Sequence, residues 1–220
     1  MIGDVDLVRD DLTALYPQFG LRIAHAGLVL TPPTDAELLD LAAIVAEPGG
    51  VLGADEAHYV TWPAGDDDAA RTFLERSWRL RRAPDEAWFV PFAVQEGGRV
   101  VGHATLARAD RPDAVWTSSW IARAEQRRGL GRRVRLMLLD LAFTHLGATR
   151  AVTSAAEDNA ASLRVSQRCG YRETHRAPHA DGTPEVHLAV TPGAWRRRRL
   201  DEVVVEGVEP FRRAISRGSP

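Results

Sequence analysis

The chain has 220 residues, of which 45% are hydrophobic and 26% charged, a balance typical of folded globular proteins and not of disordered ones. Its 28 basic residues, every one an arginine, and its 30 acidic residues give a formal net charge of -2, which excludes a global field that would draw the molecule to nucleic acid or an anionic membrane. The absence of lysine excludes a lysine Schiff base and a lysine-containing phosphate loop.

A single cysteine, Cys169, permits no disulfide within the chain. The sequence shows neither an apolar signal segment nor an apolar run long enough to cross a membrane. Together these features predict one domain with short extensions, located in the reducing cytoplasm and without a membrane partner.

The first part of the chain predicts short strands followed by two helices. Residues 1–20 carry a weak helical pattern and are predicted to form an N-terminal extension. Residues 21–30 alternate loosely between apolar and polar positions and predict one strand or a pair of short strands. The sequence T-D-A-E from Thr34 is a capping box, which predicts a helix to about Ala46.

Residues 47–68 are rich in Gly, Pro and Asp and predict a long loop that borders a pocket. Within this loop, Trp62 is a candidate wall of an acceptor pocket, although packing is the commoner role of a single tryptophan. Negative charge at Asp66–Asp68 favours a helix start. That helix is predicted to bury a face formed by Ala70, Phe73, Leu74 and Trp78.

The rest of the chain predicts a meander and a crossover. Residues 88–95 and 99–107 predict a hairpin, because Gly97 and Gly98 can supply the positive φ of a tight turn, and Pro91 indicates an edge or a bulge. The further elements are a strand over 114–122, a buried helix over 130–146, a strand over 151–155, a helix from Asn159 to Gly170, strands near 171–175 and 185–190, and a helix after Thr191. This order predicts a mixed α/β fold.

The sequence QRRGLGRR, Gln126–Arg133, lies where a strand gives way to the buried helix. A phosphate-binding turn needs free main-chain N–H groups, close approach of the backbone and the positive end of a helix dipole. Gly129 and Gly131 permit close approach, and the helix from Leu130 supplies unpaired donors. Phosphate charge can be neutralised by Arg127, Arg128, Arg132 and Arg133. A solvated helix start is the alternative interpretation.

The second basic run, Arg196–Arg199, is followed by Asp201, Glu202 and Glu206. We therefore expect a solvated face with salt bridges there, and not a nucleic-acid patch.

Three groups of residues follow one another at a characteristic spacing. They are Gln-x-x-Gly-x-Gly after a strand ending in Trp120-Ile121-Ala122, then Asn159-Ala160-Ala161-Ser162, then Arg168-Cys169-Gly170-Tyr171. This pattern resembles the GNAT superfamily of acetyl-CoA-dependent N-acetyltransferases and is most similar to the branch of the ribosomal-protein alanine acetyltransferases. The resemblance is strong over residues 99–173 and extends more weakly to residues 21 and 195.

The resemblance implies a central, mostly antiparallel, twisted sheet of about six or seven strands, splayed at its middle and flanked by helices on both faces. It places the GNAT domain at residues 21–195 and leaves 196–220 as a helical C-terminal extension. It also implies that acetyl-CoA is the co-substrate, with its pyrophosphate on the turn and its pantetheine arm paired with a strand end. The implied cofactor-binding residues are Trp120, Ile121, Ala122, Gln126, Arg127, Arg128, Gly129, Leu130, Gly131, Arg132, Asn159 and Ser162.

The implied reaction is direct attack of a neutral primary amine, on a small molecule or a protein N-terminus, with main-chain N–H groups near Ile121 stabilising the oxyanion. Many relatives use a Tyr acid at the position that here is Ser166. The candidate acid is Ser162, whose alternative role is at the helix start. A second candidate substrate-binding residue besides Trp62 is His103, which is either a base or a structural residue. We expect Cys169 to be a core thiol and not a nucleophile.

No metal site and no nucleic-acid partner is expected. The sequence leaves the acceptor amine open, as well as the choice between a monomer and a homodimer. Because the usual Tyr is absent, a catalytically impaired CoA-binding module is the alternative to an active enzyme.

Overall fold

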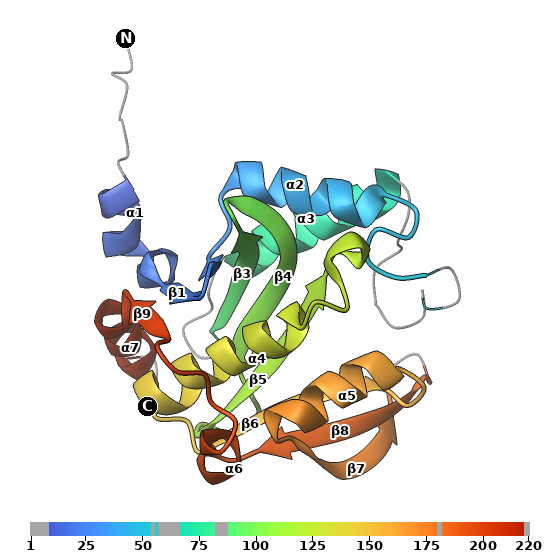
Figure 1. Ribbon diagram of the computed structural model, residues 1–220. Helices are drawn as coiled ribbons and strands as arrows, with labels where there is room; N and C mark the ends of the chain where they lie inside the picture. Colours follow the sequence, from blue (N-terminus) through green and yellow to red (C-terminus); the bar gives the residue numbers. More distant parts are fainter. Residues whose placement is uncertain (1–8, 54–55, 57–66, 82–87, 180–181, 218–220) are drawn as a thin grey trace.

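The structure is a computed structural model that describes residues 9–53, 56, 67–81, 88–179 and 182–217. Within these ranges nine strands form one sheet in the order β7-β8-β6-β5-β4-β3-β2-β1-β9 (Figure 1). The strands are β1 (Arg22–His25), β2 (Leu28–Thr31), β3 (Phe89–Glu96), β4 (Arg99–Arg108), β5 (Ala114–Ile121), β6 (Arg150–Ala156), β7 (Arg172–Pro178), β8 (Pro184–Val190) and β9 (Val204–Glu206).

All neighbouring strands pair antiparallel except β5 and β6, which are parallel. The helical elements are α1 (Arg9–Leu15), η1 (Pro17–Gly20), α2 (Asp35–Ala46), α3 (Asp67–Arg81), η3 (Arg123–Glu125), α4 (Leu130–Asp140), η4 (Leu141–His145), α5 (Ala160–Cys169), α6 (Pro192–Arg196) and α7 (Val208–Arg217). The mixed α/β fold with a mostly antiparallel sheet is confirmed, and the sheet is larger than the six or seven strands predicted.

Helices cover both faces of the sheet because alternate strand residues point to opposite sides. Phe92 of β3 belongs to a large core with α4, whereas its neighbour Ala93 belongs to a second core with α2 and α3. Helix α4 crosses the middle of the first face, and α5 lies beside it (Figure 1). The beginning of α4 therefore lies against the centre of the sheet.

Local signals set most element boundaries. In the predicted capping box, Thr34 N donates to Glu37 Oε2 at 2.6 Å, and Glu37 N donates to Thr34 Oγ1 at 3.2 Å. The predicted β3–β4 hairpin forms with Gly97 at φ 58° and Gly98 at φ 79°. The long helix predicted over 130–146 ends as an α-helix at Asp140 and continues as the π-helical turn η4.

The structure confirms the predicted face of α3 except at Trp78. Phe73 is buried, and Ala70 and Leu74 are partly buried against the same core, whereas Trp78 is 51% exposed. The fully buried stripe is Ala69, Phe73 and Ser77, spaced four residues apart, and the Ser77 hydroxyl donates to the Phe73 carbonyl at 2.7 Å.

Pro91 lies neither on an edge strand nor at the bulge, which occurs between Val94 and Gln95. β3 is an interior strand, but its pairing with β2 ends at Thr31 and Ala93. Pro91 lies beyond that end and pairs only with Thr105 of β4, so its missing N–H costs the sheet no hydrogen bond.

The segment after residue 195 contains more than the predicted helix. Val204–Glu206 form β9, which pairs with β1 at the edge of the sheet. Phe211 of α7 is buried against Trp88, with their ring centroids 5.5 Å apart. The predicted salt bridges of the Arg196–Arg199 run do not form among the described residues, and Glu206 pairs with Arg22 at 3.1 Å. The domain boundaries at 21 and 195 stay predictions.

Candidate functional site

Strands β5 and β6 separate after three paired positions. Their pairing runs from Ala114 with Arg150 to Trp116 with Val152 and then stops. At the next position the contact is no longer a main-chain pair, because Thr153 Oγ1 donates to the Thr117 carbonyl oxygen at 2.8 Å. Beyond this point the main-chain edges of both strands face an opening. This agrees with the splayed sheet that the resemblance implied.

The turn before α4 presents free main-chain donors to this opening. None of the six N–H groups from 127 to 132 donates a hydrogen bond to a described residue. Arg127 and Gly129 are both left-handed, at φ 63° and φ 80°, a geometry that directs consecutive N–H groups towards one side. A Cβ at Gly129 would meet no described heavy atom within 4 Å, and one at Gly131 would come no closer than 3.9 Å. The turn therefore has the open concave shape of an anion site.

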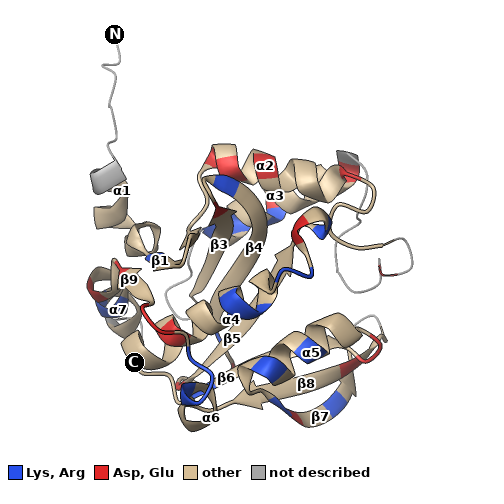
Figure 2. Cartoon of the chain, in the orientation of Figure 1, with Lys and Arg blue, Asp and Glu red and all other residues tan. Residues whose placement is uncertain are grey.

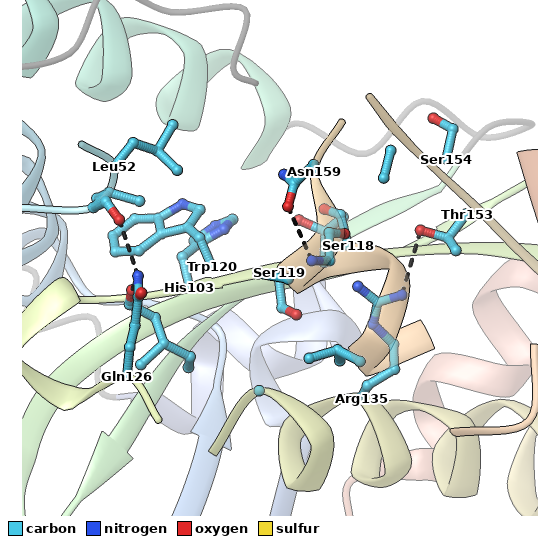
Figure 3. Close-up of a pocket in the computed structure, with 18 of the residues that line it drawn as sticks. Leu52, His103, Ser118, Ser119, Trp120, Gln126, Arg135, Thr153, Ser154 and Asn159 are labelled. Atoms are coloured by element: carbon cyan, nitrogen blue, oxygen red, sulfur yellow. Dashed lines mark hydrogen bonds between the residues drawn. The ribbon is translucent and has the colours of Figure 1, made fainter. Parts of the chain in front are cut away.

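Gln126 holds this turn in place. Its Nε2 donates to the Ile121 carbonyl at 3.0 Å and to the Val51 carbonyl at 2.9 Å (Figure 3). Arg123 N donates to the Gly50 carbonyl at 2.7 Å. These bonds tie the turn to the end of β5 and to the loop after α2, so the Gln126 side chain acts as an anchor at the edge of the cleft.

A cleft of about 1160 Å³ runs from the turn into the opening between β5 and β6. Eleven residues selected from the sequence line it: His103, Trp120, Ile121, Gln126, Arg127, Gly129, Leu130, Gly131, Arg132, Asn159 and Ser162. Ala122 and Arg128 do not line it, and Trp62 falls outside the described residues.

Arg128 is turned away from the cleft into ion pairs with Glu96, at 2.8 Å, and with Glu125. Figure 2 shows basic residues on the turn and on the neighbouring helices α4 and α5. Arg127 and Arg132 line the cleft and form no ion pair with the described residues. Arg133 does not line the cleft either, because its guanidinium donates to the His25 and Ala26 carbonyls. Arg127 and Arg132, and not Arg128 or Arg133, are therefore the available cations.

The face of the opening towards α3 is aromatic. His103 stacks on Trp120 with centroids 6.0 Å apart, and Phe73 of α3 meets both rings edge-on. Burial, assisted by the charge of Arg76, lowers the pKa of His103 from 6.5 to about 4. The imidazole is therefore neutral at pH 7. It can accept a hydrogen bond but is a weak proton acceptor.

The start of α5 leaves one hydroxyl free. Asn159 Oδ1 accepts from Ser162 N at 2.9 Å and so serves as the N-cap. Ser162 Oγ lines the cleft and has no hydrogen bond to a described residue. The capping role is therefore taken by Asn159.

Two other candidates are buried in the core. Ser166 is 0% exposed with an unpaired hydroxyl and does not line the cleft, so it does not replace the usual acid. Cys169 is also 0% exposed, and burial raises the pKa of its thiol to about 11. A neutral buried thiol is a poor nucleophile, in agreement with the predicted structural role.

Thr153 and Arg135 line the cleft but have no counterpart in the sequence prediction. Thr117 is buried directly beside them. Arg135 of α4 is 3% exposed and donates to Thr117 Oγ1 at 3.4 Å and to Thr153 Oγ1 at 3.3 Å. Figure 3 shows its guanidinium directed towards the separating strands. The sequence offered one signal for a special role of Arg135, which is its position within an apolar helical run. A buried helix face does not normally carry a charge.

No cluster of His, Cys, Asp and Glu in the described ranges could hold a metal ion, and no helix there is long and apolar enough to cross a membrane.

The sequence profile of the family described as acetyltransferase (GNAT) domain matches residues 27–172. The chain belongs to this GNAT acetyltransferase family. The matched range includes the turn, both separating strands and the start of α5, so the family match and the cleft concern the same part of the molecule.

Solved GNAT structures share this fold at low sequence identity. A GCN5-related N-acetyltransferase from Brucella melitensis is 17% identical with a TM-score of 0.66, and the alignment covers 80% of each chain. RimJ from Mycobacterium smegmatis, in complex with CoA-disulfide, is 18% identical with a TM-score of 0.58, covering 89% of this chain and 92% of its own. The aminoglycoside acetyltransferase AAC(6')-Ib, in complex with coenzyme A, is 17% identical with a TM-score of 0.58, covering 77% and 98%.

Proposed function

We propose that this GNAT domain transfers the acetyl group of acetyl-CoA to a primary amine by direct attack. The observation that carries the proposal is the run of free main-chain N–H groups at 127–132, placed at the mouth of the opening between β5 and β6. Amides before a helix bind phosphate groups, and an unpaired strand edge can accept an extended amide-containing chain. The two features together match the pyrophosphate and the pantetheine arm of CoA.

The two substrates approach from opposite faces of the sheet. The turn and α4 hold CoA on one face, whereas His103, Trp116 and Trp120 line the cleft on the face of α3. The amine reaches the thioester through the opening between the strands, and no covalent enzyme intermediate is required.

The surroundings of the amine favour its reactive form. Burial keeps His103 neutral, and the same environment disfavours an ammonium ion bound beside it. The amine therefore releases its proton to solvent before or during binding, and His103 Nε2 or Nδ1 accepts a hydrogen bond from the remaining N–H. Main-chain N–H groups near Ile121 stabilise the oxyanion. Ser162 donates a proton to the departing sulfur and regains one from solvent.

A CoA-binding module that lacks catalysis is the second candidate, because Ser166 is buried where relatives carry an acid. The two functions are separated by an assay of CoA thiol release from acetyl-CoA over a panel of small amines and peptides with free N-termini. The proposed function predicts amine-dependent thiol release together with a product heavier by one acetyl group. CoA binding without transfer to any acceptor would establish the binding module instead.

A further inference from the structure

Arg135 is a buried cation without a counter-charge. Its side chain comes from α4 and is 3% exposed, and a guanidinium stays charged at any physiological pH. No carboxylate among the described residues forms an ion pair with it. Its nearest aromatic partner is Tyr171, whose ring centroid lies 5.7 Å from Arg135 Cζ. A buried charge without a counter-charge destabilises the fold through its desolvation cost, which a bound anionic ligand would offset.

The hydrogen bonds of Arg135 are incomplete. Nη1 makes two long bonds, of 3.4 and 3.3 Å, to the hydroxyls of Thr117 and Thr153. The guanidinium also shares a side-chain hydrogen bond with the Tyr171 hydroxyl, but Nε is buried without any partner. A guanidinium offers five N–H donors in a planar fork, so part of its capacity for an anion is unused.

The fork is held where β5 and β6 stop pairing. Thr117 and Thr153 are the first residues after the last β5–β6 pair, and both are buried. The Thr117 hydroxyl also bonds to the Tyr171 hydroxyl at 2.7 Å, and Thr153 bonds to the Thr117 carbonyl. This network fixes the geometry of the two hydroxyls that Arg135 contacts, so the guanidinium is held ready at the point where the strands part.

A chain bound along β5 from the turn ends at this point. Ile121 and Thr117 are four positions apart, a rise of about 14 Å along an extended strand. On the proposed function, on which this inference rests, the pantetheine arm follows this edge, and its end is the sulfur atom. Because Arg135 comes from the same face as the turn, it meets the sulfur and not the incoming amine.

We propose that Arg135 is a catalytic residue that binds the sulfur of CoA and stabilises it as a thiolate. The amine nitrogen forms a bond to the carbonyl carbon, the C–S bond breaks, and its electron pair remains on sulfur. The amine proton passes to solvent. Arg135 N–H groups hydrogen-bond to the negative sulfur, so the thiolate can depart before it is protonated. Proton donation by Ser162 then speeds the reaction but is not required for it. A permanent charge on another helix thus serves the departing sulfur, which a Tyr acid protonates in many relatives of this family.

The test measures the thiol pKa of CoA in its complex with the protein, from thiolate ultraviolet absorbance between pH 6 and 9. The titratable groups that pack around Arg135 are Tyr171, whose pKa is raised by burial, and Cys169, whose pKa is about 11, so neither contributes in this range. The other charged side chains that line the cleft are Arg76, Arg123, Arg127, Arg132, Arg164, Arg168, Glu56, Glu125 and Glu185. They are the same in the wild type and in Arg135→Gln, so the difference between these two proteins reports on Arg135.

Wild-type protein should lower the thiol pKa of bound CoA by at least about one unit, and Arg135→Gln should abolish this shift while CoA still binds. Arg135→Lys should retain part of it. In turnover, Arg135→Gln should lower kcat roughly 100-fold and change KM for acetyl-CoA less than about threefold. The control is Arg133→Gln on the same helix, since Arg133 donates to the His25 and Ala26 carbonyls away from the cleft.

Several results would overturn the inference. If CoA binds to Arg135→Gln with an unchanged thiol pKa shift, Arg135 does not contact the sulfur, although the proposed function survives. If wild-type protein prefers an acyl-CoA that ends in a carboxylate over acetyl-CoA, and Arg135→Gln loses that preference, Arg135 binds the acyl group instead. Failure of wild-type protein to bind CoA at all would remove both the inference and the proposed function.

Discussion

Thr153 of β6 donates its side-chain hydroxyl to the main-chain carbonyl of Thr117 in β5 at 2.8 Å, one residue beyond the last pair of these strands. A side chain thus spans a gap that a main-chain hydrogen bond would close in a continuous sheet. The bond defines where the sheet opens, and it leaves the remaining edges of both strands for a ligand.

Thr153→Val should weaken this junction. The substitution keeps the shape of the side chain but removes the donor, so a buried carbonyl and one Arg135 contact lose a partner. We expect the free energy of unfolding to fall by about 1–2 kcal/mol, measured by urea denaturation. Thr144→Val is the control, because its hydroxyl makes only a 3.4 Å bond to Asp140 on the partly exposed end of the long helix. Equal, negligible losses in both variants would show that the junction does not depend on the hydroxyl.

Gly102→Ala should distort the strand that lines the cleft. A Cβ at Gly102 would overlap the main-chain oxygen of Trp120 and lie 3.0 Å from Ile121 Cα. Because main-chain atoms cannot yield as a side chain can, we expect a loss of about 2 kcal/mol in stability together with weaker CoA binding. Gly193→Ala meets nothing within 4 Å and has no positive φ, so it should be neutral or stabilising. Normal stability and CoA affinity in Gly102→Ala would contradict the described β4–β5 contact.

The motifs that the sequence predicted correctly are those whose physics is local. A capping box, a glycine pair in a hairpin and a glycine before a helix act through neighbouring backbone groups, so Thr34, Gly97 and Gly129 could be interpreted without knowing the fold. The strand β9 was missed because three residues carry too short an alternating pattern, and it forms only because β1 offers an unpaired edge.

The role of a side chain depended on tertiary contacts that the sequence does not encode locally. Arg128 and Arg127 are adjacent and chemically identical, yet one pairs with Glu96 and Glu125 while the other faces the cleft. Arg135 escaped notice because helical periodicity marks which positions are buried, not whether a buried cation has a partner. Ser162 could not be assigned between two roles until Asn159 was seen to form the cap.

His103 should make the protein less stable in mild acid. Its pKa is about 4 in the folded state and 6.5 when unperturbed, so the unfolded chain binds the proton first. The contribution of neutral His103 to the free energy of unfolding is therefore fully present above pH 6.5 and is lost as the pH falls from 6.5 towards 4. His103→Phe should flatten the stability curve in this window by roughly 2 kcal/mol, after allowance for partial solvent contact. Unfolding free energies at pH 4.5 and pH 7.5 provide the comparison, and an identical slope in both proteins would show that His103 titrates normally.

Ser162→Ala should separate catalysis from helix capping. Because Asn159 caps α5, the substitution should leave the melting temperature within about 1 °C and lower kcat about tenfold or less. Asn159→Ala should instead cost about 1 kcal/mol of stability. Calorimetric melting and steady-state kinetics on both variants distinguish the roles. A stability loss in Ser162→Ala equal to that in Asn159→Ala would assign the serine to the helix start.

The central claim, that the free amides before α4 grip the diphosphate of CoA, is tested most directly by titration calorimetry of CoA against Gly129→Glu and Gly147→Glu. Both glycines have positive φ, at 80° and 73°, and a Cβ at either meets nothing within 4 Å, so backbone strain is matched at the two ends of the same long helix. We predict that Gly147→Glu binds CoA like the wild type, whereas Gly129→Glu binds at least roughly 100-fold more weakly, because its carboxylate competes with the phosphates for the same donors. Equal affinity of all three proteins for CoA would contradict the account.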